Sequence, residues 1–543
     1  MPARRGSPGE WKKQRAMKTY DYVVVGAGSA GCVVATRLVE AGRSVLLLEA
    51  GPRDDSLFVR MPGATFRLIG SARTWLYETE PQPAANGRKM VVPQGRTLGG
   101  GSSVNGMVYI RGNPADYDGW RDAGCPGWGW ADVLPVFKRT ERNARLAGPL
   151  HGTDGPLAVG DATLRHPLSR AFVQAGQEIG LPHNEDFNGP SQEGVGFYQT
   201  TIAGGVRAST PASYLARVRG RPGLEILTDR LVTRVVVENG QAVGIAFRNT
   251  DGTEGAARVR EEVILSAGTL ATPKILMLSG IGPAAHLAAC GVEVVRDLAG
   301  VGANFHDHLG VSVYGRTRRP ISLLGQDRGV RAARHALQWL LFRNGLLSSN
   351  VIESGGFADT DGDGRVDVQF HVIPTLTGDV DRPPPPGHGL SINTCVLRPR
   401  SRGTVRLRGA DPAAPIRFDG RFLSDAADIA TLKRGVALAR RILRAPALKR
   451  LIESEILPSA ADEIDDAALE AHVRAIAKTV YHPVGTCRMG SDDGAVVDPQ
   501  LRVRSLDRLR IADASIMPAI TSGNTNAPAI MIGERCADFI LGR

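Results

Sequence analysis

The hydrophobic pattern near the start of the chain predicts a strand, a helix and a second strand. Residues 20–25 (YDYVVV) form a short apolar run with β-branched side chains, which is typical of a buried strand. Residues 32–39 repeat apolar positions at helical spacing, and residues 44–48 (SVLLL) predict the next strand. Farther along, residues 262–265 (EVIL) predict another buried strand that ends in small residues.

A glycine-rich motif joins the first strand to the helix. Residues 26–31 (GAGSAG) have the G-x-G-x-x-G spacing of a dinucleotide-binding turn. Gly26 makes the tight turn, Gly28 lets the backbone approach a pyrophosphate, and Gly31 allows close packing of helix and strand. The start of the helix offers unpaired N–H groups to phosphate. Glu49 ends the second strand, where a carboxylate binds ribose hydroxyls, so FAD or NAD is favoured over NADP.

Composition narrows the class of protein. The chain has 543 residues, of which 42% are hydrophobic and 22% charged, which excludes a disordered, collagen-like or coiled-coil chain. The 65 glycines and 34 prolines predict many tight turns. Six scattered cysteines, without a C-x-x-C pair, argue against a disulfide scaffold and a structural zinc site. No run reaches the roughly 18 apolar residues of a membrane span.

The net charge of +11 does not indicate a nucleic-acid-binding site, because the arginines are dispersed along the chain and no basic run with interleaved aromatic residues occurs. Weak attraction to an anionic membrane surface remains open. Residues 1–17 are expected to be a disordered basic extension, with Met17 as a natural start. We expect a soluble, cytoplasmic protein, with peripheral contact to the inner membrane and homo-oligomer formation both left open.

Several longer motifs carry a family resemblance. Residues 95–111 (GRTLGGGSSVNGMVYIR) are a glycine-rich loop able to lie against a flat ring, and residues 262–282 continue from a strand into a turn and a helix that opens with proline. These segments resemble the two signature motifs of the glucose-methanol-choline (GMC) oxidoreductases, which are FAD enzymes that oxidise alcohols. Residues 301–309, 481–490 and 524–529 extend the resemblance, which covers the chain from about residue 18 to 543.

The resemblance implies an α/β (α+β) fold of GMC type, with a Rossmann-like FAD-binding domain and an intergrown substrate domain built on an antiparallel sheet with helices. The FAD domain would comprise residues 18–160, 200–310 and 475–543, and the substrate domain residues 161–199 and 311–474. Val104 stands where covalently flavinylated members carry a histidine, so non-covalent FAD is expected. The implied cofactor-binding residues are Gly26, Gly28, Ser29, Gly31, Glu49, Ala50, Arg96, Gly100, Asn105, Gly106, Met107, Val108, Val232, Asp513, Ala514, Asn524 and Thr525.

Oxidation of an alcohol by a flavin requires a base for the hydroxyl proton and a polar group that holds the oxygen. A neutral imidazole suits the first task. By resemblance, His482 is the general base and Asn526 is the amide that orients the substrate oxygen. Glu353 matches a substrate-facing glutamate of choline-oxidising members, although the aromatic residues that favour a trimethylammonium group are absent before it.

Other residues that could bind a metal or react chemically are better explained by structural roles. His306 and His308 form an H-x-H pair without an apparent third ligand, so no metal is expected. Residues 359–364 (DTDGDG) start like an EF-hand loop, but a surface turn is favoured over a calcium site. Cys487 is expected to be a small buried neighbour of His482. Residues 336–342 (ALQWLLF) are apolar and fit either a hydrophobic access face or core packing.

The sequence therefore favours FAD-dependent oxidation of a primary alcohol to the aldehyde, with electrons passed to a quinone-like carrier or to oxygen. Two alternatives stay within the family: a hydroxynitrile lyase with a redox-silent flavin, and a choline dehydrogenase. A flavoprotein without turnover and an NAD dehydrogenase fit the motifs less well. The identity of the alcohol and of the electron acceptor is left open.

Overall fold

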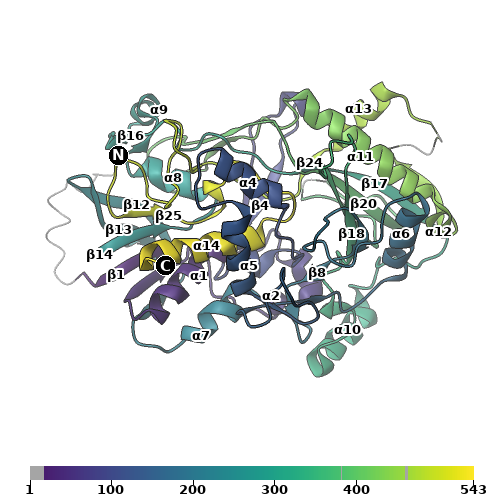
Figure 1. The fold of residues 1–543 in the computed structure, drawn as a ribbon, viewed down its shortest axis with the longest axis horizontal. Coiled ribbons are helices and arrows are strands. Elements are labelled where there is room, and N and C mark those ends of the chain that lie inside the picture. Colours follow the sequence, from purple (N-terminus) through teal and green to yellow (C-terminus); the bar gives the residue numbers. More distant parts are fainter. Residues whose placement is uncertain (1–16, 381, 459–460, 462) are drawn as a thin grey trace.

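The computed structural model describes residues 17–380, 382–458, 461 and 463–543. The basic extension, apart from Met17, lies outside the described residues. Two large sheets, each with its own hydrophobic core, lie at opposite ends of the molecule along its longest axis (Figure 1). This mixture of helices and sheets confirms the expected α/β class. Within the described residues, no helix has the length and apolar character that crossing a bilayer requires.

The first sheet is built around the apolar run that predicted the first strand. β1 (Thr19–Val25) lies between β2 (Val45–Leu48) and β14 (Glu254–Leu265), and it is parallel to both. Val25 pairs with Leu48 and with Leu265, so the carboxyl ends of these strands meet at one edge of the sheet. The order is β11-β2-β1-β14-β13-β12, with β25 beside β14; the bounds are β11 (Leu224–Leu227), β12 (Arg230–Glu238), β13 (Gln241–Asn249) and β25 (Leu509–Ile511).

The second sheet is antiparallel and lies under helix α11 (Ala426–Arg444), which packs on β20 and β17. Its order is β23-β17-β20-β19-β18-β7, with β24 also paired to β17. Every residue of β20 is buried, which explains its apolar and small side chains. The bounds are β7 (Gly194–Phe197), β17 (Leu309–Thr317), β18 (Ser354–Ala358), β19 (Val368–Ile373), β20 (Gly389–Val396), β23 (Ile452–Leu457) and β24 (Lys478–Thr479).

β24 lies within residues 475–543, which we expected in the FAD domain, yet it belongs to the second sheet. Leu309 of β17 pairs with Thr479 of β24. This short pairing brings the chain to the space between the two sheets just before His482.

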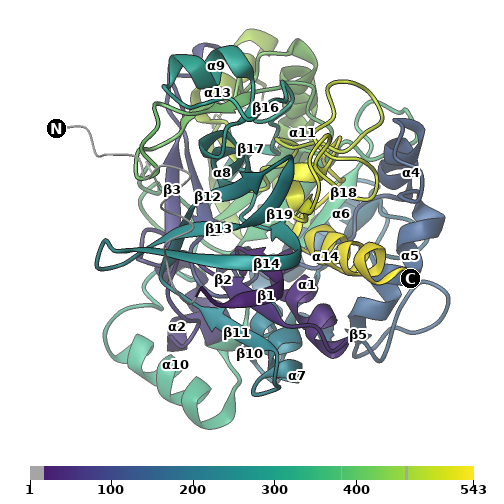
Figure 2. The same cartoon turned by 90° about the vertical axis from the view of Figure 1, so that its left-hand side faces the viewer.

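Helices α1 (Ser29–Glu40) and α14 (Asn526–Leu541) pack against each other beside the first sheet (Figures 1 and 2). Gly533 permits the close approach, since a Cβ atom there would lie 2.7 Å from the carbonyl oxygen of Ala30. The first residues of the two helices, Ser29 and Asn526, both line the large cavity.

Shorter elements connect and cover the two sheets. The remaining helices are α2 (Leu57–Arg60), η2 (Pro62–Arg67), η3 (Pro83–Ala85), α3 (Gly101–Val104), α4 (Pro114–Asp122), α5 (Trp130–Thr140), α6 (Pro167–Glu178), η4 (Pro211–Leu215), α7 (Ala216–Val218), α8 (Ala271–Leu278), α9 (Ala284–Ala289), α10 (Gly329–Phe342), η5 (Leu346–Ser348), α12 (Pro446–Lys449), α13 (Asp466–Ile476) and η6 (Ala514–Ile516). The remaining strands are β3 (Thr74–Glu78), β4 (Val91–Gly95), β5 (Glu141–Asn143), β6 (Leu157–Asp161), β8 (Gln199–Thr200), β9 (Ile202–Ala203), β10 (Val206–Arg207), β15 (Ile281–Gly282), β16 (Arg296–Asp297), β21 (Thr404–Arg406) and β22 (Arg417–Asp419).

Candidate active site

A cavity of about 1560 Å³ extends from the carboxyl edge of the first sheet to the second sheet, where residues of β17, β19 and β20 line it. Most residues expected to bind a dinucleotide or to catalyse a reaction line this cavity. They are Gly26, Gly28, Ser29, Glu49, Ala50, Gly100, Asn105, Gly106, Met107, Val108, Val232, His482, Asp513, Ala514, Asn524, Thr525 and Asn526. Gly31, Arg96 and Glu353 are not part of the lining.

The glycine-rich turn has the geometry that a phosphate site needs. Gly26 has a φ of 96°, and a Cβ atom there would lie 2.4 Å from the carbonyl oxygen of Ser266. A Cβ on Gly31 would lie 2.0 Å from the Gly26 carbonyl oxygen, so Gly31 serves the helix packing. At Gly28 the nearest atom to such a Cβ is 3.9 Å away, which leaves open space toward the cavity. Because no side chain caps α1, its first N–H groups remain available to an anion.

Glu49 is held at the end of β2 by the turns around it. Its carboxylate accepts hydrogen bonds from the N–H groups of Ala27 (3.1 Å) and Gly51 (2.9 Å). Burial raises the pKa of Glu49 to about 7, and these donors and the charge of Arg96 oppose that rise. Arg96 itself stacks on the ring of Trp75 at 4.5 Å, and its role in cofactor binding stays a prediction.

The glycine-rich loop before Met107 is fixed by a buried arginine that the sequence did not single out. The Asn105 side-chain oxygen accepts hydrogen bonds from the Met107 N–H (3.0 Å) and from the Arg207 guanidinium (2.9 Å). The amide NH₂ of Asn105 is therefore the group left to donate within the cavity. Arg207 also donates to the carbonyl oxygens of Val59 and Ser102, and burial lowers its pKa to about 9.

Asp513 orders the opposite wall of the cavity. Its carboxylate accepts hydrogen bonds from the Thr272 hydroxyl (2.7 Å) and from the N–H groups of Gly268 (2.9 Å) and Ser515 (2.8 Å). Burial raises the pKa of Asp513 despite these donors. The carboxylate thus fixes the turn after β14 and the start of η6, where Ala514 lines the cavity.

Two histidines and an asparagine from distant segments meet at the second sheet. His482, in the loop after β24, places Nε2 3.1 Å from Nδ2 of Asn524, which precedes α14. The other ring nitrogen of His482, Nδ1, lies 3.1 Å from Nδ1 of His308, just before β17. A further histidine, His371 of β19, lies 3.4 Å from the same Asn524 amide.

The hydrogen bonds assign the protons on these rings. Nε2 of His308 lies 3.0 Å from the carbonyl oxygen of Leu397, which only accepts, so this nitrogen carries the hydrogen. Nδ1 of a neutral His308 is then an acceptor, and His482 Nδ1 must donate to it. Consequently Nε2 of His482 carries a lone pair, which accepts from the Asn524 amide; both residues line the cavity.

All three imidazoles are neutral at neutral pH. Burial lowers the pKa of His482 well below its usual value, and the nearby His308 and His371 add to the effect. Burial likewise lowers the pKa of His308 to about 3 and that of His371 to about 4. Asp307 accepts a hydrogen bond from the backbone N–H of His482 (2.8 Å) and so fixes the loop, while burial raises its own pKa to about 7.

Asn526, the expected partner of His482, is not beside it. Its side-chain oxygen accepts a hydrogen bond from the Ser29 hydroxyl (2.7 Å) at the start of α1. Asn526 is the first residue of α14, whereas Asn524 is still in the preceding loop, and the turn between them aims the two side chains at different ends of the cavity. Asn524, expected at the cofactor, therefore takes the position assigned to Asn526.

Glu353 is also placed differently from expectation. Its side chain is buried outside the cavity lining and accepts hydrogen bonds from the His166 N–H (2.7 Å) and the Ser349 hydroxyl (2.8 Å). The neighbouring Ile352 lines the cavity in its place.

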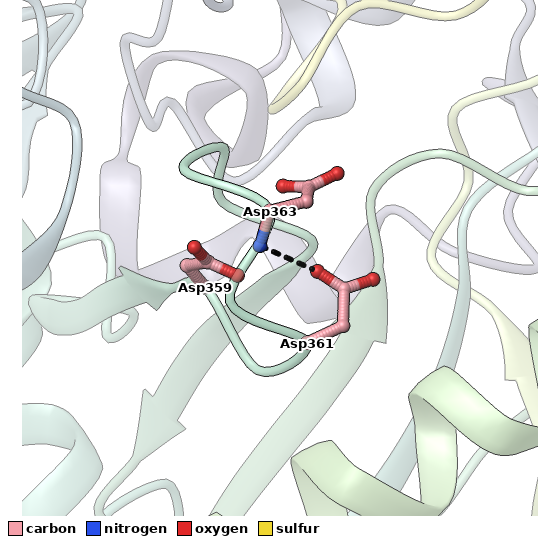
Figure 3. Close-up of side chains that lie close together, drawn as sticks. All are labelled: Asp359, Asp361 and Asp363. Carbon is pink, nitrogen blue, oxygen red and sulfur yellow. Dashed lines mark hydrogen bonds between the residues drawn. The ribbon is translucent and has the colours of Figure 1, made fainter.

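The groups considered for metal binding have protein partners. Figure 3 shows Asp359, Asp361 and Asp363 in the exposed loop after β18, with ligand atoms within 4.8 Å of one another. Arg434 pairs with Asp361 (3.3 Å) and Arg398 with Asp363 (3.0 Å), so arginines offset part of the acidic charge. His306 bonds to the Asn304 carbonyl oxygen and the Ile520 N–H. Cys487 is a fully buried free thiol whose pKa burial raises.

Comparison with known proteins places the chain in a family. The sequence profile of the GMC oxidoreductases matches residues 20–310 in its N-terminal part and residues 399–533 in its C-terminal part. The chain belongs to the GMC oxidoreductase family. As a GMC oxidoreductase it is an enzyme, and the strand, glycine turn and helix at its front form the Rossmann-like part of that fold.

Among GMC oxidoreductases, the chain is 44% identical to alcohol dehydrogenase [acceptor] of Pseudomonas putida, over 96% of either chain. It is 39% identical to oxygen-dependent choline dehydrogenase of Brucella suis, also over 96% of either chain. The structure of Aspergillus oryzae formate oxidase, studied for its FAD modification, aligns with a TM-score of 0.91 at 27% identity, covering 97% of this chain and 98% of the other. Both the family and the formate oxidase structure support FAD as the cofactor, and the open space at Gly28 fits the FAD pyrophosphate.

Proposed function

We propose that this GMC oxidoreductase oxidises a primary alcohol to the aldehyde. The observation that carries the proposal is the contact of His482 Nε2 with the Asn524 amide, between two residues that line the cavity, while His308 holds the other ring nitrogen. A neutral imidazole with a fixed acceptor nitrogen is suited to removing a hydroxyl proton. The relative from Pseudomonas putida, an alcohol dehydrogenase, supports this reaction class.

FAD would be held by the turn at Gly26 and Gly28, by Glu49 at the ribose and by the loop around Asn105. When bound, it supplies the acceptor, at flavin N5, for the hydride that leaves the substrate carbon. We infer non-covalent binding because Val104, the residue next to Asn105, has no group that can bond to the flavin. The reaction removes a proton and a hydride from the alcohol, which is a two-electron oxidation.

The residues at the second sheet act on the alcohol itself. The substrate hydroxyl would replace the Asn524 amide as the hydrogen-bond partner of His482 Nε2, and that nitrogen would take the proton. The resulting imidazolium keeps its bond from Nδ1 to His308, so the ring does not turn when it is charged. The Asn524 amide would donate to the substrate oxygen, and Gln369 fixes its orientation by donating to the Asn524 side-chain oxygen (3.1 Å).

An uncharged primary alcohol fits the cavity better than choline. The carboxylate expected to attract a trimethylammonium group, Glu353, is turned away, and Ile352 takes its place. The choline dehydrogenase relative keeps choline as the second candidate. We propose that electrons then pass to a quinone-like carrier or to oxygen.

The test is an anaerobic visible spectrum of the purified protein, recorded before and after adding aliphatic, aromatic and quaternary-ammonium alcohols. Bleaching of the flavin band by one class is expected, and His482→Ala should slow it by about 10²- to 10⁴-fold while FAD stays bound. Admission of air then separates oxygen from another acceptor by the speed of recolouring. A flavin that no alcohol bleaches would contradict the proposal and favour a hydroxynitrile lyase.

A further inference from the structure

Helix α10 projects from the body of the molecule (Figures 1 and 2). Several of its apolar side chains are exposed to solvent. Leu337, Leu341 and Phe342 are 58%, 63% and 68% exposed, and Val330 is 86% exposed. The spacings of seven and four residues place Val330, Leu337 and Leu341 in one stripe. Trp339 alone is buried in α10, so core packing does not explain this apolar segment.

Positive charge lies on the same exposed side of α10 as the apolar stripe. At 100° per residue, Arg334 shares the face of Val330 and Leu341, and Arg331 lies between that face and Phe342; both arginines are exposed. α10 contains no acidic residue, and Arg328, immediately before it, is 81% exposed. An exposed helix face that combines apolar side chains with arginines is typical of a helix that lies in a membrane interface, where long side chains reach the phosphates.

The stripe lies next to elements that line the cavity. Asp327, just before α10, pairs with Arg67 of η2 (3.7 Å), and η2 packs against η5, which follows α10. Phe66 of η2 is half exposed and lines the catalytic cavity. An exposed apolar side chain of the cavity lining therefore lies in an element that neighbours the α10 region.

We propose that α10 docks this protein on the surface of an anionic phospholipid bilayer. Leu337, Leu341 and Phe342 enter the boundary between headgroups and acyl chains, and Arg331 and Arg334 bind lipid phosphates. A second copy of the chain fits less well, because a symmetric contact of α10 with α10 would bring arginines together without an acidic partner on the helix. Docking is independent of the alcohol chemistry, and it brings η2, whose Phe66 lines the cavity, near lipid-soluble acceptors dissolved in the bilayer.

The experiment is flotation of the FAD-loaded full chain with vesicles of phosphatidylglycerol and phosphatidylcholine, and with vesicles of phosphatidylcholine alone. We expect binding to the anionic vesicles that weakens in high salt. Arg331→Gln combined with Arg334→Gln should lower the affinity by about 30-fold, at the strength typical of arginines near an anionic surface. Leu337→Ser combined with Leu341→Ser and Phe342→Ser should lower it by at least about tenfold.

The matched control replaces exposed valines at the other end of the molecule, Val294→Ser with Val295→Ser near β16, and should bind vesicles like the wild type (Figure 2). Flavin reduction by a water-soluble alcohol should be unchanged in every variant, which separates lost docking from misfolding and from failure of the proposed chemistry. A wild type that does not float, or a control as weak as the α10 variants, would overturn the proposal. The proposal would also be overturned if the wild type did not bind vesicles and light scattering showed that it forms a dimer, which the α10 variants dissociate and the control does not.

Discussion

Replacement of His308 tests whether this residue sets the reactive form of His482. In His308→Leu the Nδ1–H group of His482 loses its acceptor in a buried site. A buried donor without a partner costs about 1–3 kcal/mol. The free energy of the reactive tautomer rises by that amount, and its population falls accordingly. The rate of flavin reduction should therefore fall by roughly 5- to 150-fold, less than for removal of the base itself.

His308→Gln is the matched control. Its side-chain oxygen can accept from His482 Nδ1 while its amide donates to the Leu397 carbonyl oxygen, so the proton pattern of the wild type is retained. Anaerobic stopped-flow reduction of the flavin measures the rates, and FAD content and thermal unfolding show whether the variants are folded. We expect the glutamine variant to reduce its flavin much faster than the leucine variant. If the leucine variant is as fast as the wild type, or if both variants are equally slow, His308 does not set the tautomer.

Three further predictions concern the rest of the cavity. Gly28→Val should purify without flavin, because the side chain fills the open space beside the α1 terminus; a fully yellow variant would exclude a pyrophosphate there. Asn524→Ala should slow flavin reduction at unchanged FAD affinity, whereas Asn526→Ala should chiefly weaken FAD binding, as measured by stopped flow and fluorescence titration. The reductive rate should stay constant as pH falls to 6.5 and decline only below it, because burial lowers the pKa of His482; an inflection above that pH would contradict a neutral base.

Much of the fold followed from local sequence. Parallel strands buried on both faces have continuous apolar runs, so β1, β2 and the end of β14 were readable, and the glycine turn marked the edge where their carboxyl ends meet. The antiparallel sheet was expected only from the family resemblance. β18, β19 and β20 follow one another in the chain, but β7, β17, β23 and β24 come from distant segments, and no local pattern specifies their pairing.

The site was predictable as a set of segments but not as a set of contacts. The motif around residues 524–526 contains two asparagines, and which of them meets His482 depends on where α14 begins. Helix boundaries are the least certain part of a sequence-based assignment, and a shift of two residues exchanged the roles of Asn524 and Asn526. Arg207 and His371 had no motif around them, because their importance comes from contacts made in the folded chain.

His308 belongs to the H-x-H pair, which from the sequence alone we interpret as structural. In the folded chain, its contact with His482 also affects the chemistry of the proposed base. A carboxylate in the position of His308 would also hold the Nδ1–H group of His482, but its charge would raise the pKa of the base. The neutral imidazole of His308 holds the same proton without adding charge, and the chain of donors ends on the Leu397 carbonyl oxygen. Asp307, the carboxyl nearest in sequence, binds the backbone N–H of His482 and not the ring. This division of roles fixes the ring while keeping it unprotonated, which is the state that a base for an alcohol proton requires.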